Sequence, residues 1–61
     1  MLTVGQIVHA EGQGTMTFKI IDLMQNRTFA TVQAFNIPKQ TLTGMTLNVP
    51  IAMLTPHKDA N

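Results

Sequence analysis

The 61-residue sequence contains no cysteine, serine, tryptophan or tyrosine, and it carries little charge. Without cysteine the chain forms neither a disulfide nor a thiolate metal site, and without cysteine or serine it lacks the two commonest nucleophiles. Four Lys or Arg residues against three Asp or Glu residues give a formal net charge of +1. No basic run is present, so the sequence lacks the concentrated positive charge that marks many nucleic-acid-binding proteins.

The chain also lacks long apolar segments. None approaches the roughly 20 residues that span a membrane, so no membrane partner is expected. The first residues lack the basic start and apolar stretch of a secretory signal, which together with the absence of cysteine predicts a cytoplasmic protein. Hydrophobic residues nonetheless make up 44% of the chain and charged residues only 11%, which is too apolar for a disordered protein.

Residues 16–35 predict a β-hairpin with its turn at residues 24–27. Every second residue from 16 to 20 is apolar, as in a strand with one buried face. The apolar positions change face at Ile21, which predicts a bulge. In the turn, Asn26 is the residue best suited to a left-handed backbone. A helix over residues 16–23 is the competing interpretation, and the Thr and Ile content favours the strand.

The second half of this hairpin is rich in Thr, Phe and Val, which suit a pleated surface. Its alternation predicts two faces, one with Phe29, Thr31, Gln33 and Phe35, and the other with Ala30, Val32 and Ala34.

Residues on either side of the hairpin predict further short strands. Residues 2–10 form the first, with Val4 or Ile7 and Val8 turned inward, and two glycines predict a turn at residues 11–14. After Pro38 ends the hairpin, residues 41–49 alternate as a strand that Gly44 interrupts. Residues 51–54 predict a 3₁₀ turn that leads into a last strand near Leu54.

About five short strands with no long helix predict an all-β fold, a small barrel with a 3₁₀ turn before its last strand. The segment Leu47-Asn-Val-Pro-Ile-Ala-Met-Leu54 resembles the ending of SH3-like barrels in the order and length of its elements. This resemblance implies an SH3-like barrel over residues 1–55, followed by a flexible C-terminal tail at residues 56–61.

A chain of this length buries a small core, and neither a disulfide nor a metal is available to stabilise it. The five methionines suit irregular cores and partner surfaces alike. These features predict a homo-oligomer, with a compact monomer as the alternative.

No constellation of residues predicts an enzyme, a metal site or a cofactor. Glu11 and Asp22 lack a catalytic partner nearby in the sequence and are expected to be solvated surface charges. His9 is expected to be a half-buried or surface residue, and His57 lies in the polar tail.

A candidate nucleic-acid site consists of Lys19, Arg27, Lys39 and Phe29, because single-stranded nucleic acid binds exposed aromatic residues beside basic ones. The alternative places all three phenylalanines in the core. Residues 32–39 are also similar to the Asn-Ala-Pro-Lys segment of carbon storage regulators, small dimeric RNA-binding β proteins. The Val-His-Arg-Glu-Glu motif and the Arg-containing first strand of that family are absent, so no binding residue follows from this similarity.

The sequence therefore predicts a non-enzymatic, oligomeric binding module with a regulatory role in binding RNA or DNA. The alternative is a protein-interaction or inhibitor module from a phage or mobile element, since a short apolar chain leaves room for an exposed apolar patch. An enzyme assembled from several copies, as in SH3-like oligomeric reductases, ranks last because their Val-Gln-Ile-Tyr active-site segment is missing.

Overall fold

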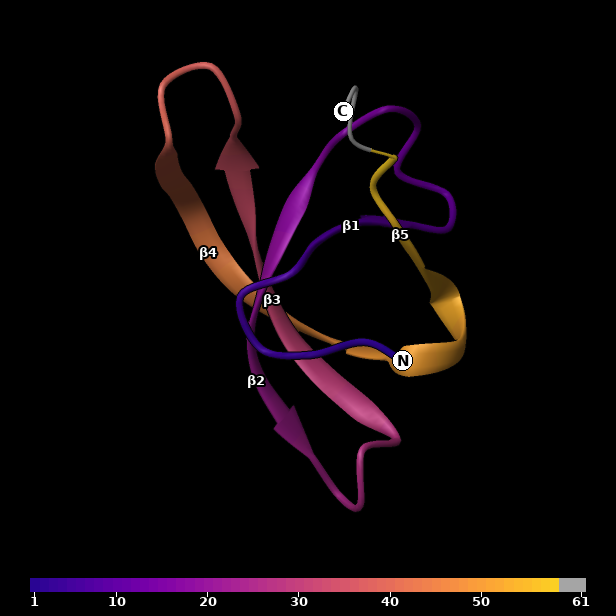
Figure 1. Cartoon of the computed structure of the whole chain (residues 1–61). Helices are drawn as coiled ribbons and strands as arrows, with labels where there is room; N and C mark the ends of the chain where they lie inside the picture. Colours follow the sequence, from indigo (N-terminus) through magenta and orange to yellow (C-terminus); the bar gives the residue numbers. More distant parts are fainter. Residues whose placement is uncertain (59–61) are drawn as a thin grey trace.

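Five antiparallel strands form a single sheet in the computed structural model, which describes residues 1–58 (Figure 1). The elements are β1 (Ile7–Ala10), β2 (Phe18–Met24), β3 (Phe29–Asn36), β4 (Thr41–Pro50), η1 (Ile51–Met53) and β5 (Leu54–Pro56). The strands follow the order β4-β3-β2-β1-β5 across the sheet. The fold is therefore all-β, as predicted, and a 3₁₀ turn, η1, precedes the last strand. No helix within residues 1–58 has the length and apolar character needed to cross a membrane.

The predicted hairpin is formed by β2 and β3, and its turn has an unusual backbone. Gln25, Asn26 and Arg27 have φ angles of 53°, 56° and 66°. The prediction of a left-handed Asn26 is thus confirmed, and both neighbours share this conformation. Thr28 closes the turn, because its amide and its hydroxyl both donate to the Gln25 carbonyl, at 3.2 and 2.6 Å.

The predicted bulge in β2 is also confirmed. Its register against β3 shifts between Ile20 and Asp22, so Ile21 has no partner. Ile20 pairs with Val32 before the shift and Leu23 pairs with Ala30 after it. Because cross-strand partners share a face, the bulge turns both apolar side chains inward and leaves the sheet free to bend.

The core lies on the inner face of the bent sheet, against β1, β2, β3 and β5. Val8, Ile20 and Val32 are fully buried at its centre. Alternation on β3 follows the prediction, since Ala30 and Val32 face the core. β4 contributes no buried side chain, so one edge of the sheet extends beyond the core. The core cluster is Val8, Ala10, Phe18, Ile20, Ala30, Val32 and Leu54.

The N-terminal strand is shorter than predicted. Gly5 has a φ of 92° and lies in a turn, where its amide donates to the Ile20 carbonyl at 2.8 Å. The strand consequently begins at Ile7. Val8 points inward as predicted, but Val4 precedes the turn and is 58% exposed, so an inward Val4 is wrong.

The alternative that places all three phenylalanines in the core is correct for two of them and wrong for Phe29. Phe18 and Phe35 are buried, whereas Phe29 is 36% exposed at the start of β3. At the C-terminus, Pro56 belongs to β5 and the His57 amide donates to the Ile7 carbonyl at 2.9 Å. Of the expected flexible tail, residues 59–61 lie outside the described residues.

Candidate functional site

The strand β4 forms one edge of the sheet, and its outer side pairs with no other strand within residues 1–58. Its residues from Thr41 to Asn48 are all exposed. None of its ten residues is charged. Proteins commonly protect edge strands with lysine or other charged side chains. An uncharged and exposed edge is therefore available to pair with a strand of another chain. Among its apolar residues, Leu42 is 43%, Leu47 44% and Met45 82% exposed.

A bulge divides β4 into two regular parts. Thr43 pairs with Ala34 and Thr46 pairs with Gln33, so Gly44 and Met45 have no partners on β3. Gly44 adopts a φ of 73°, which favours glycine. Its carbonyl accepts a hydrogen bond of 2.8 Å from the Gln33 side chain. The predicted interruption at Gly44 is therefore confirmed.

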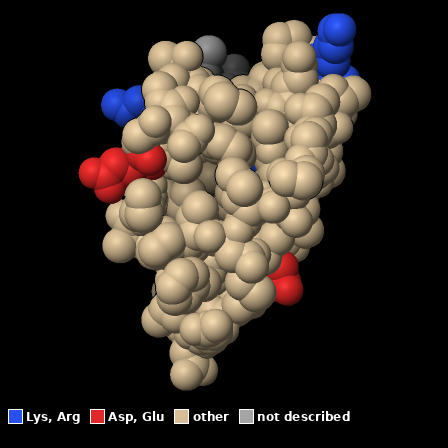
Figure 2. Space-filling view, turned by 180° about the vertical axis from the view of Figure 1, so that it is seen from behind, with Lys and Arg blue, Asp and Glu red and all other residues tan. Residues whose placement is uncertain are grey.

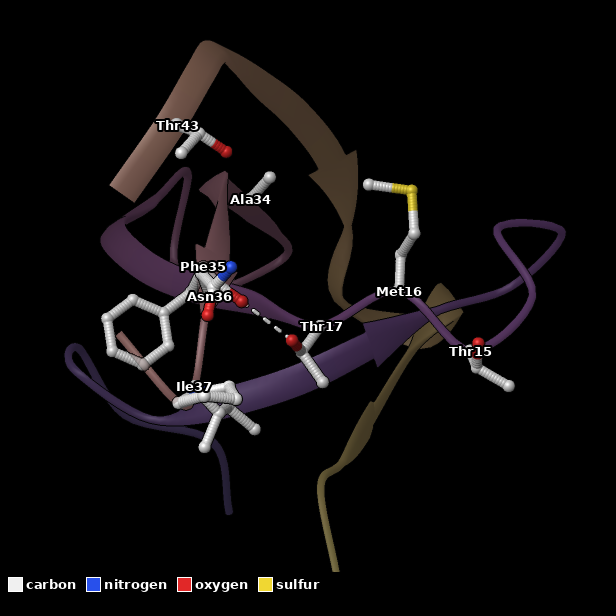
Figure 3. A pocket seen from close by; sticks show the side chains of 9 residues that line it. Thr15, Met16, Thr17, Ala34, Phe35, Asn36, Ile37 and Thr43 are labelled. Atoms are coloured by element: carbon white, nitrogen blue, oxygen red, sulfur yellow. Dashed lines mark hydrogen bonds between the residues drawn. The ribbon is translucent and has the colours of Figure 1, made fainter. Parts of the chain in front are cut away.

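A groove runs along the inner side of β4, between this strand and the segment that leads into β2. One hollow of about 410 Å³ lies beside Thr17. Figure 3 draws the side chains that line it. A second, of about 390 Å³, lies beside Leu47. The two share Met16, Ala34 and Thr43, so we treat them as one surface, the β4 groove. The lining residues are Gln13, Thr15, Met16, Thr17, Phe18, Ala34, Phe35, Asn36, Ile37, Pro38, Thr43, Gly44, Met45 and Leu47.

Hydrogen bonds fix the wall of this groove. The Thr17 hydroxyl donates to the Phe35 carbonyl at 2.7 Å, and the Phe35 amide donates to the Thr17 carbonyl at 3.0 Å (Figure 3). Both contacts extend the pairing of β2 and β3 to Thr17, one residue before β2 begins. Met16 precedes Thr17 and lines the groove together with Thr43 and Ala34, with half of its surface exposed.

The chemistry of the β4 groove is uncharged. None of its lining residues is Lys, Arg, Asp or Glu. Figure 2 shows a face of the molecule on which charged side chains appear only near the margins. Apolar methionine and leucine side chains with threonine hydroxyls between them suit an apolar chain segment better than a charged ligand.

The predicted nucleic-acid residues divide between the two ends of β3. Lys19 lies with its Nζ atom 4.4 Å from the centre of the Phe35 ring, and Lys39 lies in the turn between β3 and β4. Arg27 lies in the opposite turn, next to Phe29, and donates to the Leu2 carbonyl at 2.7 Å.

The distance between these ends matters for electrostatics. The eight residues of β3 span about 25 Å, which is more than twice the Debye length at physiological salt. The structure therefore does not bring Lys19, Arg27, Lys39 and Phe29 together into one patch.

The two histidines meet, although 48 residues separate them in the sequence. His9 Nε2 lies 2.9 Å from His57 Nδ1, and His9 Nδ1 lies 3.1 Å from the Met16 carbonyl oxygen. Glu11 and Asp22 are exposed. Within residues 1–58, no group of three or more His, Asp or Glu side chains is placed to hold a metal ion.

Sequence reasoning did not assign a site to Met16, Met45 or Leu47. Alternation placed Met45 and Leu47 on one face of a strand but gave no indication that this strand lies at the edge of the sheet. Two features of the sequence could have indicated this site. They are the absence of charge from residues 41–50 and the number of methionines.

Comparison of the chain with known protein families, with characterised proteins and with solved structures finds no match. The candidate site therefore depends on the geometry of this chain alone.

Proposed function

We propose that this protein is a non-enzymatic binding module, built on an SH3-like barrel, and that its β4 groove binds protein. The barrel assignment is supported by the strand order β4-β3-β2-β1-β5 and by the 3₁₀ turn that precedes β5. Such small barrels act as scaffolds whose function resides in surface grooves and loops. The sequence-based alternative of a protein-interaction or inhibitor module becomes the leading proposal.

The observation that carries this proposal is the uncharged β4 groove. Met16, Met45 and Leu47 expose 49%, 82% and 44% of their surfaces around it. Apolar surface of this kind costs free energy in water, at about 25 cal/mol per Å², and is covered favourably by a protein partner. Methionine suits this role because its flexible side chain adapts to a partner's shape.

Selection from a displayed peptide library tests the proposal. Wild-type protein is expected to enrich apolar peptides with few charges, and fluorescence anisotropy then measures their affinity. Met16→Lys places a charge in the groove and should weaken binding at least tenfold. Val4→Lys is the matched control, because Val4 is similarly exposed but lies outside the groove.

Two results would contradict the proposal. One is the absence of any enriched peptide, and the other is equal loss of affinity in both lysine variants. Circular dichroism of each variant verifies that the fold is retained.

Nucleic-acid binding is the second candidate function, and the exposed Phe29 beside Arg27 favours it. The pair puts an aromatic face and a cation at one end of the hairpin, as single-stranded nucleic acid requires. Anisotropy with labelled single-stranded RNA, single-stranded DNA and duplex DNA at two salt concentrations tests it. Binding that weakens steeply with salt and is lost in Arg27→Ala is expected, and flat traces at both concentrations exclude this function.

A further inference from the structure

The free edge of β4 presents a defined set of backbone groups. The Ile51 amide donates to the Thr28 carbonyl at 2.9 Å, at the end of the ladder in which Pro50 pairs with Phe29. Backbone groups of an antiparallel strand point to its two sides alternately. Val49 and Leu47 therefore bond to β3, whereas the amides and carbonyls of Thr46 and Asn48 point away from the sheet.

We propose that β4 pairs antiparallel with β4 of a second copy of this chain, about a two-fold axis at Leu47. Thr46 of each copy then lies opposite Asn48 of the other. The two outward residues exchange amide-to-carbonyl hydrogen bonds on both sides of the axis, which makes four bonds in total. The two five-stranded sheets become one continuous sheet of ten strands.

The neighbouring registers are poorer. An axis at Asn48 places Thr46 opposite Pro50, which has no amide to donate. An axis at Thr46 places Asn48 opposite Gly44, which lies in the bulge and departs from strand geometry. With the axis at Leu47, Pro50 and Gly44 face each other beyond the paired residues. The pairing is then confined to Thr46, Leu47 and Asn48, which are regular strand with complete donors and acceptors.

Side chains favour the same register. The two Leu47 side chains lie directly opposite each other, and each is 44% exposed in the single copy. They meet on the groove side of the sheet and cover each other. No charge on β4 opposes its own copy across the axis, so two-fold pairing brings no like charges together.

The interface of this dimer is small. Interfaces bury up to about 40 Å² per residue on each side, so the six residues 45–50 of β4 with Gln13 and Met16 correspond to about 300 Å² per copy and about 600 Å² in all. This is the size of a weak interface, so the dimer is expected to dissociate on dilution.

A second copy of the chain is one protein partner for β4. The proposed dimer rests on the proposed function only in assigning protein binding to this strand. The residues that line the hollow beside Thr17 lie outside the paired segment Thr46–Asn48. Failure of dimerisation leaves peptide binding to be measured on the monomer, so the two proposals fail separately.

A single-cysteine experiment tests the register directly. Opposed residues without mutual hydrogen bonds have Cα atoms about 4.5 Å apart, which is within the range that a disulfide spans. Because the chain contains no cysteine, any disulfide of a Leu47→Cys variant joins two copies. Mild oxidation of Leu47→Cys should give a covalent dimer at least tenfold faster than oxidation of Leu42→Cys, which has the same exposure but lies beyond the bulge.

Sedimentation velocity over a range of concentrations tests the uncrosslinked protein. Wild type should approach twice the monomer mass, and Leu47→Lys should stay monomeric, because two opposed charges repel at the axis. Leu42→Lys should still dimerise. Thr46→Pro removes an outward amide and should also give a monomer, whereas Thr46→Val retains the amide and should dimerise.

Three outcomes would overturn the proposal. They are a wild-type monomer at all concentrations, a dimer that Leu47→Lys and Thr46→Pro leave intact, or equal crosslinking of the two cysteine variants. Circular dichroism of all variants separates loss of pairing from loss of fold.

Discussion

At the scale of single residues, the histidine pair has a defined hydrogen-bond direction. The Met16 carbonyl oxygen only accepts, so His9 Nδ1 carries the hydrogen in the contact between them. The neutral His9 ring then has Nε2 free to accept, and His57 Nδ1 donates to it. This chain of bonds connects β1 both to the segment before β2 and to the residue that follows β5.

The first prediction is that both rings hold their hydrogen on Nδ1 at a pH at which both are neutral. Long-range ¹H–¹⁵N NMR correlations of the imidazole nitrogens measure the tautomers. His57→Phe is the control, because His9 should keep the Nδ1–H form through its bond to Met16. A hydrogen on Nε2 of wild-type His9 would contradict the bond from His9 Nδ1 to the Met16 carbonyl.

At the scale of elements, the bulge in β4 separates the two regular halves of the edge strand. Its conformation depends on Gly44, whose φ of 73° lies in the left-handed region. An added Cβ atom would meet nothing within 4 Å, so a substitution here costs backbone strain and no steric clash. The position therefore isolates the conformational role of the glycine.

The second prediction is that Gly44→Ala lowers the free energy of unfolding by about 1 kcal/mol, the usual cost of a left-handed non-glycine residue. Gly44→Asn should cost less, because asparagine tolerates this backbone. Urea denaturation at one fixed protein concentration measures both. Thr46→Ala, at an exposed extended position on the same strand, is the control. Equal costs for the alanine and asparagine variants would show that backbone strain is not the cause.

At the scale of the whole molecule, the small core and the unpaired edge are related. Seven residues form the core cluster, and two of them are alanine. The sheet extends beyond this core at β4, where apolar side chains stay exposed. In the proposed dimer a second copy would cover part of that surface, and stability would then depend on protein concentration because the partner binds the folded state only.

The third prediction concerns this dependence. Above the dissociation constant of the dimer, the Tm of wild type should rise by about 3–5 °C for each tenfold increase in protein concentration. The Tm of Leu47→Lys should not change with concentration, and that of Leu42→Lys should follow wild type. Differential scanning calorimetry measures the shifts. A constant wild-type Tm would count against linked folding and association.

Much of the local structure could be predicted from the sequence alone. Alternation identified the hairpin and the two faces of β3, the change of apolar parity at Ile21 identified the bulge, and Asn26 identified the turn. These features were predictable because side-chain direction in a strand alternates with period two, and because few residues adopt a left-handed backbone.

The exposure of each surface depends on the tertiary arrangement of the strands. This arrangement puts β4 at the sheet edge, so the apolar side chain of Leu47 stays partly exposed. It also leaves Phe29 exposed and Phe35 buried, although the alternation along β3 puts both on the same face. It placed Arg27 and Lys39 at opposite ends of β3 and joined His9 to His57. The physical reason is that exposure and proximity depend on strands that are distant in sequence, and a period along one strand carries no information about its neighbours.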